Sequence, residues 1–459
     1  MKRVIRGMSG QAFSRGAIFI NTLGVVPMLL AAWGLTVYGE WITLTAIATL
    51  TSLSNFGLAN AASTEILKAT GASDNDRAQT VFGTAFIALA CIFGPVLLVI
   101  FGLVLVLPVA EMLKITHVSN TGIIIITMAM ASQVWLNTVK GLFFGASFSS
   151  GTYAAPNLVS GLVKLLELAS LGVAVGYFHG GPAYAAVVIA CVAGLDLIAQ
   201  AALAVRAAPW LKLRNVGIDR TCLKMLMGPS MGAALLHLGV NFVGVQGPRI
   251  ILSSVAGPEA VGVFSVYATA TRIIDQISSL AMSVFQIEFS RTSGGGQTDV
   301  TMKLLSVGGR INVASCLILS CGLLVGGPIA FDMWTHGRVS FEYPLACAFL
   351  LATLFVQTAK APLTYLQGAN YLFKPVVTML IAGAIGLAIG SPLAHAWGPL
   401  GMAMGKILAE GLALIVVTVF AAHSIGTNSR TLLLTQFNLL GFMRQAYGLW
   451  RTSLRRSPA

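Results

Sequence analysis

Charged residues are scarce in this sequence of 459 residues: Asp, Glu, Lys and Arg make up 9% of it, whereas about 25% is usual in a soluble domain. Hydrophobic residues make up 56%. A soluble fold of this length could not bury so much apolar surface, so most of it is expected to face lipid. The scarcity of charge argues against a soluble protein and predicts a polytopic α-helical membrane protein.

The sequence also lacks the parts that membrane enzymes and pumps need. Twelve spanning helices of roughly 20 residues each, with short connectors, would use nearly all of its length and leave no room for a folded domain outside the membrane. It contains no GxxxxGK[ST] motif, which argues against a nucleotide-driven pump. Its six cysteines form neither a CxxC pair nor a Cys/His cluster, so we expect no disulfide and no zinc site.

The basic residues lie almost entirely on one side of the predicted helices. Of the 28 Lys and Arg, only Lys114 and Arg338 lie in segments expected to face outward, six lie inside apolar segments, and the other 20 are expected on the cytoplasmic side. This asymmetry follows the positive-inside rule, and it explains the net charge of +13 without a nucleic-acid partner. It predicts a multi-pass protein of the bacterial inner membrane with both termini in the cytoplasm.

Twelve membrane spans are predicted from the apolar segments. Glu40 and Trp41 follow the first span and are expected at its outer end, where tryptophan commonly anchors a helix at the interface. The predicted spans are 15–37, 42–66, 80–107, 120–145, 154–178, 183–205, 228–252, 260–288, 304–330, 343–366, 374–395 and 400–423.

The two halves of the chain resemble each other at an offset of about 220 residues. Lys140 in the fourth span recurs as Lys360 in the tenth, and the corner 38–41 recurs as the corner 261–264. Six helices are an even number, so a second copy would insert in the same orientation as the first. We therefore expect two pseudo-symmetric six-helix bundles with a cleft between them, as in alternating-access transporters.

The expected domain organisation has four parts. The longest basic internal segment separates the two sets of six helices. After the last span, leucine and phenylalanine alternate with amide and basic residues, which is typical of a helix lying on a membrane surface. The parts are an N-terminal six-helix lobe (1–206), a basic cytoplasmic connector (207–227), a C-terminal six-helix lobe (228–423) and a basic amphipathic cytoplasmic tail (424–459).

Ten ionisable side chains within the predicted spans are expected at bilayer depth, where each costs about 3 kcal/mol to insert and is therefore a candidate for function. The six cations are Lys140, Lys164, Arg249, Arg272, Lys360 and Lys406, and the four anions are Glu167, Asp196, Asp275 and Glu410. Opposite charges one helical turn apart can neutralise each other along one helix. Three pairs have that spacing: Lys164/Glu167, Arg272/Asp275 and Lys406/Glu410.

After these pairs are set aside, the interior carries more positive than negative charge. Lys140, Arg249 and Lys360 remain against Asp196, and Arg15 could extend the positive field towards the cytoplasm. Ammonium and guanidinium groups match phosphate oxygens, so an anionic cargo is favoured over a cationic drug. The two lysines could instead extend to the headgroups, because both lie near cytoplasmic helix ends.

Three local segments carry a resemblance to a known family. They are 35–59, with a Tyr-Gly-x-Trp corner and Asn55 where many relatives have Asp; 249–267, a helix hairpin; and 366–370, Leu-Gln-Gly-Ala-Asn. In these segments the sequence resembles the polysaccharide-transport branch of the multidrug/oligosaccharidyl-lipid/polysaccharide exporter superfamily, which includes O-antigen and exopolysaccharide flippases. The resemblance implies a V-shaped pair of lobes that moves a polyprenyl-pyrophosphate-linked oligosaccharide from the inner to the outer leaflet.

The charges inside the spans, read with this resemblance, define candidate sites for a non-enzymatic transporter without a cofactor. Substrate-binding candidates are Arg249, Arg272, Lys140, Lys360, Lys164 and Arg15. Asp196 and Asp275 are candidates for coupling to H⁺ or Na⁺. Expected partners are the lipid-linked oligosaccharide, membrane lipids, a polysaccharide polymerase and a chain-length regulator.

Three alternatives stay open. A multidrug exporter of the same fold would need an acid-rich interior. A flippase for the peptidoglycan precursor usually has fourteen spans. A membrane polymerase or ligase would need catalytic residues in an outer loop, and the longest such loop, 331–342, offers only Asp332, His336, Arg338 and Glu342.

Overall fold

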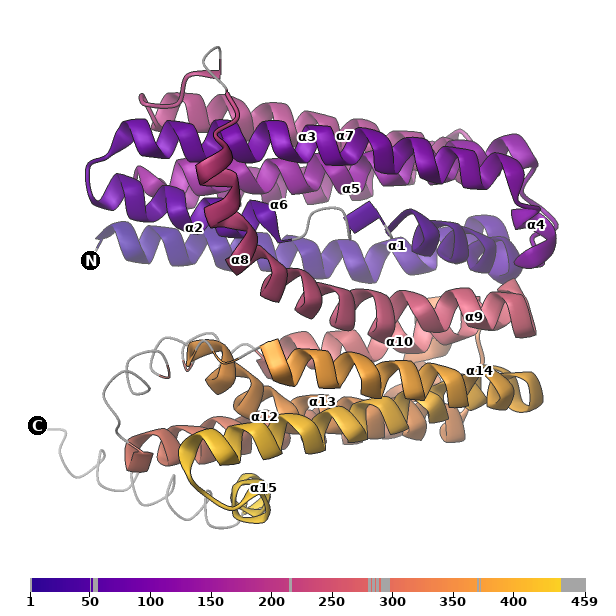
Figure 1. The fold of residues 1–459 in the computed structure, drawn as a ribbon. Coiled ribbons are helices and arrows are strands. Elements are labelled where there is room, and N and C mark those ends of the chain that lie inside the picture. The colour runs from indigo at the N-terminus through magenta and orange to yellow at the C-terminus, as the bar shows by residue number, and fades with distance from the viewer. Residues whose placement is uncertain are drawn as a thin grey trace, which may run out of the picture. The chain divides into compact units, whose positions relative to one another are not determined.

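All regular secondary structure in the described part of the chain is helical (Figure 1). The structure is a computed structural model, and it describes residues 2–49, 51–52, 57–213, 217–279, 282, 285, 289, 298–369, 371 and 373–438. Asn55 and the tail beyond residue 438 lie outside the described residues, so the predictions made for them stay predictions.

By packing, the chain divides into two compact units. Unit 1 comprises Met1–Val266 and Met333–Val339, and unit 2 comprises Tyr267–Asp332 and Ser340–Ala459. This division follows side-by-side packing, whereas the predicted lobes, 1–206 and 228–423, follow the sequence repeat. The predicted lobe boundaries therefore stay a prediction.

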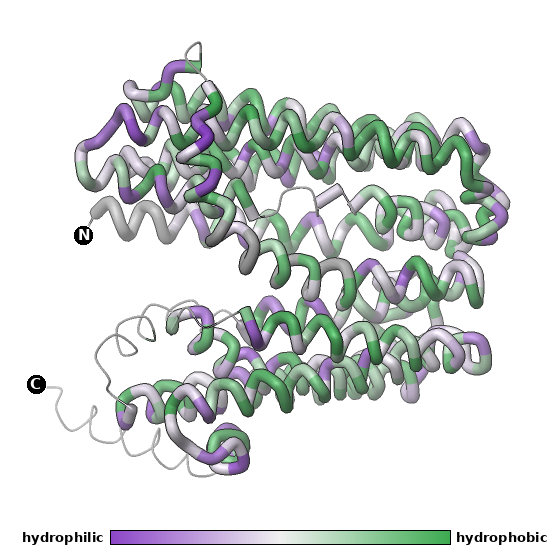
Figure 2. Tube along the Cα trace, viewed as in Figure 1, coloured by the Kyte–Doolittle hydropathy of each residue, from purple (hydrophilic) through white to green (hydrophobic). Residues whose placement is uncertain are grey.

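Unit 1 is built from long helices that pack side by side. Within it α5 packs against α2, α3 and α7, while α1 packs against α6. Figure 2 shows hydrophobic residues along most of each helix and hydrophilic residues gathered near the helix ends. The helices are α1 (Lys2–Ala48), α2 (Leu58–Gly71), α3 (Asn75–Val106), α4 (Val109–Met112), α5 (Asn120–Ser149), α6 (Ala154–Leu171), the π-helix η2 (Gly172–Tyr177), α7 (Pro182–Ala207), α8 (Arg220–His237), the π-helix η4 (Leu238–Gln246), α9 (Gly247–Ala256) and the first part of α10 (Pro258–Ser278).

The predicted connector is held against the unit 1 helices. The Gln79 side chain donates a hydrogen bond to the Lys212 carbonyl oxygen at 2.8 Å and accepts one from the Lys212 amide at 2.9 Å. The Asp219 carboxylate then caps α8 by accepting from the Cys222 amide at 2.7 Å. Residues 207–227 thus include the first turns of a helix as well as a loop.

Unit 2 is built mainly from three long helices. They are α12 (Thr298–Thr335), whose last residues belong to unit 1, α13 (Tyr343–Gly368) and α14 (Phe373–Ile425). The two halves of α14 meet at Trp397 and Gly398, where Gly398 has a φ of 55°. A Cβ on Gly405 would meet the Gly386 carbonyl oxygen and the Gly390 Cα, both at 2.5 Å. Gly386, Gly390 and Gly405 therefore form a close-packing surface between the two halves of α14.

Eight helices in the described residues are long and apolar enough to cross a membrane. Two of them, α1 and α14, each contain parts of two predicted spans. The predicted seventh span falls on α8, η4 and α9, and the eighth begins with α10. The prediction of an all-α polytopic fold with about twelve membrane-spanning helices is confirmed.

The first described part of the predicted tail forms a short helix docked on unit 2. This helix, α15 (Ser429–Phe437), follows the end of α14 (Figure 1). Leu432 and Gln436 are buried, and the Arg310 side chain donates from Nε to the Thr435 carbonyl oxygen at 2.7 Å. Leu434 remains exposed, so one face packs on the protein while an apolar residue stays on the surface.

Candidate functional site

Each of the four carboxylates predicted at bilayer depth pairs with a lysine. The pairs within one helix are Lys164/Glu167, at 2.6 Å, and Lys406/Glu410, at 2.9 Å, and both confirm the prediction from spacing. The pairs between helices are Lys140/Asp196, at 2.7 Å, and Lys360/Asp275, at 3.4 Å. The third predicted same-helix pair, Arg272/Asp275, is replaced by Lys360/Asp275.

Asp275 pairs with Lys360 because α13 supplies a second hydrogen-bond donor to the Asp275 carboxylate. Gln357, one turn before Lys360, donates from Nε2 to the Asp275 carboxylate. Arg272, one turn before Asp275 on α10, is exposed. Spacing along α10 permits the Arg272 pair, but α13 offers the carboxylate an ammonium group and an amide donor together.

The pair in unit 1 is enclosed by protein. Lys140 of α5 donates to Asp196 of α7, and the Asp196 side chain is only 4% exposed. Gln200, also on α7 and fully buried, donates to Asp196 at 3.3 Å and to the Pro156 carbonyl oxygen of α6 at 3.0 Å. These contacts join three helices around one carboxylate.

The pair in unit 2 belongs to a larger polar cluster. Besides Lys360 and Gln357, Ser279 donates to the Asp275 carboxylate at 3.3 Å. Asn312 of α12 donates from Nδ2 to Gln357 Oε1 at 3.2 Å, and both amide side chains are fully buried. The Asp275 side chain nevertheless remains 33% exposed. This carboxylate is therefore supported from three helices while one side stays accessible.

The two interhelical lysines lie in matching four-residue segments. Residues 137–140 read Asn-Thr-Val-Lys and residues 357–360 read Gln-Thr-Ala-Lys. In both segments the threonine donates to the carbonyl oxygen four residues earlier, at 3.0 Å for Thr138 and at 2.8 Å for Thr358. The amide residue and the threonine extend the similarity between the two halves of the chain beyond the lysines themselves.

The four carboxylates pair with lysines, and the two arginines add two further positive charges at bilayer depth. Arg249 of α9 is partly buried, and its guanidinium donates to Gln246 Oε1 at 3.1 Å. Arg272 of α10 and Arg15 of α1 are exposed. Lys164 donates to Glu167, which also accepts from Asn21 of α1 at 3.5 Å. Of the predicted cationic candidates, Lys140, Lys164 and Lys360 thus lie in ion pairs.

The described residues contain no group of three or more His, Cys, Asp or Glu side chains arranged to hold a metal ion. The polar groups inside the spans are instead single carboxylates beside lysines, with amide and hydroxyl side chains around them. This chemistry suits the binding of charged groups.

The fold is that of known multi-pass exporters and flippases. One similar structure is an inward-facing multidrug resistance MATE family transporter of the MOP superfamily, with a TM-score of 0.70, 15% identity, and coverage of 91% of this chain and 94% of the other. Its outward-facing counterpart has a TM-score of 0.60, 14% identity, and coverage of 93% and 96%. The lipid II flippase MurJ, in an inward closed conformation, has a TM-score of 0.67, 12% identity, and coverage of 95% and 92%.

The likeness lies in the structure rather than in the sequence. No protein-family model matches the chain, and no characterised protein matches it by sequence. At 12–15% identity the three structures establish the fold, and the fold does not determine the cargo.

Proposed function

We propose that this protein is a flippase that moves a polyprenyl-pyrophosphate-linked oligosaccharide from the inner to the outer leaflet of a bacterial inner membrane. The exported unit would serve O-antigen or exopolysaccharide synthesis. The observation that carries the proposal is the charge count at bilayer depth: six cations, which are four lysines together with Arg249 and Arg272, stand against four carboxylates.

An anionic lipid-linked cargo fits this balance. A guanidinium group presents several N–H donors in a plane and can bind two phosphate oxygens at once. Arg272 is exposed, so a pyrophosphate could reach it without first breaking an ion pair of its own helix. The prenyl chain would stay in the lipid, because its transfer out of an apolar phase would be unfavourable.

The fold supports transport by alternating access, and its relatives span two cargo classes. The similar structures include multidrug transporters and a flippase whose name gives lipid II as its cargo. The excess positive charge favours the second class for this chain, because a cationic drug would be repelled. A polysaccharide polymerase and a chain-length regulator would be the partners that act on the delivered unit.

Coupling to H⁺ or Na⁺ would use Asp275 rather than Asp196. Both carboxylates were candidates, but the Asp275 side chain is 33% exposed and the Asp196 side chain is 4% exposed. A coupling ion has to enter and leave the site once per cycle. The accessible carboxylate meets that requirement, whereas the enclosed one is held by Lys140 and Gln200.

The test is the double variant Arg249→Gln/Arg272→Gln in a strain whose own copy of the gene is deleted. We expect loss of surface polysaccharide while the protein remains in the membrane at the wild-type level. Each guanidinium–phosphate hydrogen bond contributes about 1.5–3 kcal/mol, so both losses together should slow export by well over tenfold. Full export by this variant would refute the proposal.

A matched control removes two arginines from other places. Arg206 at the end of α7 and Arg430 in α15 are exposed, so Arg206→Gln/Arg430→Gln changes the net charge equally and should preserve export. The variant Arg249→Lys/Arg272→Lys keeps the charge but loses the planar donors, and we expect intermediate export.

The second candidate function is an ion-coupled multidrug exporter, favoured by the similarity to multidrug transporters. It predicts resistance to cationic dyes when the protein is overproduced. Unchanged dye resistance together with loss of surface polymer in the deletion strain would exclude it.

A further inference from the structure

Two glycines from matching positions of the sequence repeat pack against each other's helices in unit 1. A Cβ on Gly39 of α1 would clash with the Pro258 carbonyl group of α10, and a Cβ on Gly262 of α10 would lie 2.9 Å from the Leu35 carbonyl oxygen of α1. Pro258 precedes Gly262 by four residues, as Leu35 precedes Gly39. The contact is therefore reciprocal, as expected where equivalent helices of a repeat cross near its symmetry axis.

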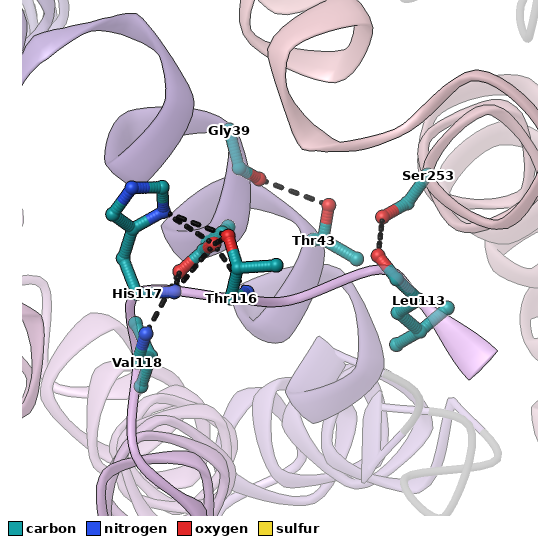
Figure 3. Close-up of polar contacts among 8 residues, drawn as sticks. Gly39, Thr43, Leu113, Thr116, His117, Val118 and Ser253 are labelled. Atoms are coloured by element: carbon teal, nitrogen blue, oxygen red, sulfur yellow. Dashed lines mark hydrogen bonds and ion pairs between the residues drawn. The ribbon is translucent and has the colours of Figure 1, made fainter. Parts of the chain in front are cut away.

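Next to this crossing lies a fully buried carboxylate, that of Glu40. It accepts hydrogen bonds from three successive backbone amides, those of Thr116 at 2.8 Å, His117 at 3.0 Å and Val118 at 3.0 Å. The His117 imidazole Nδ1 also lies 3.1 Å from Glu40 Oε1. Figure 3 shows these three loop residues beside the turn of α1 that contains Gly39 and Thr43.

Glu40 and Trp41 were predicted to follow the end of the first span at the membrane interface, and the prediction that the helix ends before them is wrong. Glu40 is fully buried and Trp41 is 5% exposed. The reason is that α1 does not end near residue 37. It bends at Gly34, which has a φ of 77°, and continues to Ala48. The bend carries residues 38–41 inside unit 1, where Glu40 caps the loop before α5.

The same loop also binds α9, on its other side. The Ser253 hydroxyl of α9 donates to the Leu113 carbonyl oxygen at 2.8 Å, and the Lys114 ammonium donates to the Val255 carbonyl oxygen at 2.8 Å (Figure 3 for the first contact). Residues 113–118, which we term the strap, therefore connect α1 to α9. By the sequence repeat, α1 belongs to the first half of the chain and α9 to the second.

We propose that the strap is a releasable lock at the predicted outer end, anchored by the Glu40 carboxylate, which holds α1 and α9 together until cargo leaves. This inference rests on the transport function proposed above. For any cargo to exit on that side, helices of the two repeats must separate there. Because α1 and α9 also pack directly on each other, separation needs the release of that packing together with either the Glu40 contacts or the α9 contacts of the strap.

A carboxylate suits this position because an ionised carboxylate only accepts hydrogen bonds, and its two oxygens can accept from all three converging N–H donors. Replacing it by an amide keeps the shape but offers one acceptor oxygen and places an NH₂ group against N–H donors. The variant Glu40→Gln should therefore loosen the strap and leave the helices in place. Glu111→Gln is the matched control, since Glu111 is an exposed acid in the short helix α4 just before the strap.

The first experiment is independent of cargo. In a variant whose six cysteines are replaced by alanine, Thr43→Cys is labelled from outside with a membrane-impermeant maleimide; Thr43 is fully buried one turn after Gly39. We expect at least a fivefold faster labelling when Glu40→Gln is added and no change with Glu111→Gln. Equal labelling rates in all three proteins would overturn the anchoring role of Glu40.

The second experiment locks the strap. Leu113→Cys/Ser253→Cys, joined by oxidation, should abolish labelling at position 43 and stop export, and a reducing agent should restore both. Each single-cysteine variant is the control. If the oxidised pair exports at the wild-type rate, the strap is static and the proposal fails. If labelling responds as expected but no glycan lipid is exported by the wild-type protein, the lock stands and the proposed cargo fails instead.

Discussion

The two lysine–aspartate pairs, one in each unit, differ in how they are enclosed. In unit 1 Lys140 and Asp196 are 2.7 Å apart, and their side chains are 15% and 4% exposed. In unit 2 Lys360 and Asp275 are 3.4 Å apart, and their side chains are 32% and 33% exposed. The lysines occupy matching positions in the sequence, but the amide residue three positions earlier differs: Gln357 donates to Asp275, whereas Asn137 donates to the Gln133 carbonyl oxygen.

The two pairs differ in exposure because their aspartates lie on different helices with different neighbours. Asp196 follows Lys140 in the chain on α7 and is held by the buried Gln200. Asp275 precedes Lys360 on α10 and is held by Gln357, which in turn is held by Asn312. Unit 1 thus uses its lysine to stabilise a helix junction, and unit 2 presents an accessible charge pair.

The largest predicted effect is on the enclosed pair. Asp196→Asn leaves the Lys140 ammonium mostly buried without a carboxylate, and breaking such a pair costs about 3–5 kcal/mol. We expect a large fall in the thermal unfolding temperature in detergent and in the amount of protein in the membrane. The double variant Lys140→Met/Asp196→Leu removes both charges and should recover most of the loss. Wild-type stability of Asp196→Asn would show that the pair is not structural.

The accessible pair should respond in the opposite way. Asp275→Asn changes a partly exposed ion pair, for which a stability change of about 1 kcal/mol or less is expected. If Asp275 exchanges the coupling ion as proposed, export should nevertheless fall by about tenfold or more, equivalent to at least about 1.4 kcal/mol in the barrier. Surface polymer normalised to membrane protein measures this. Unimpaired export would remove Asp275 from the mechanism.

A smaller effect is expected where the two matching segments differ, at Asn137 and Gln357. Gln357→Asn shortens the side chain by one methylene group, so its amide no longer reaches Asp275, and loss of this hydrogen bond should cost about 1–1.5 kcal/mol. Export should fall about threefold to tenfold. Asn137→Gln is the reciprocal control, and it should have no effect on export because Asn137 donates to the Gln133 carbonyl oxygen and not to Asp196. Equal effects of the two changes would argue that the units are functionally alike.

The smallest effect is expected at the pair within α14. Lys406 and Glu410 face each other at one helical turn, 2.9 Å apart, and such pairs contribute about 0.2–0.5 kcal/mol. Lys406→Gln/Glu410→Gln should therefore change neither the unfolding temperature nor export measurably. A tenfold loss of export would instead place this pair on the transport route.

Spacing along one helix was enough to predict some contacts. It gave the pairs Lys164/Glu167 and Lys406/Glu410, because residues three and four apart share a helix face. It could not give Lys140/Asp196 or Lys360/Asp275, since those depend on which faces of two helices meet. For Asp275 both a same-helix arginine and a partner on another helix were within reach, and only the packing of α10 on α13 decides between them.

The all-helical fold was predictable because apolar segments of spanning length are a strong signal. Helix ends were less predictable. A corner containing Gly39, Glu40 and Trp41 reads as a polar break, yet α1 continues through it and buries Glu40 against the loop. A carboxylate can be buried when three backbone N–H groups lie within hydrogen-bonding distance of it. The sequence of α1 does not show this, because the donors lie about 76 residues further along the chain.

The central claim is that the cargo is a lipid-linked glycan, and the most direct test is to locate that glycan. Right-side-out vesicles are prepared from a strain lacking this gene, with and without a plasmid copy, and are treated with a membrane-impermeant sugar-modifying reagent. The polyprenyl-linked glycans are then extracted, and their masses are measured by mass spectrometry. If the cargo is a lipid-linked glycan, complete units should be protected from the reagent without the gene and modified when it is restored, but still protected with Arg249→Gln/Arg272→Gln. Glycan lipids that are equally modified in all three strains would contradict it.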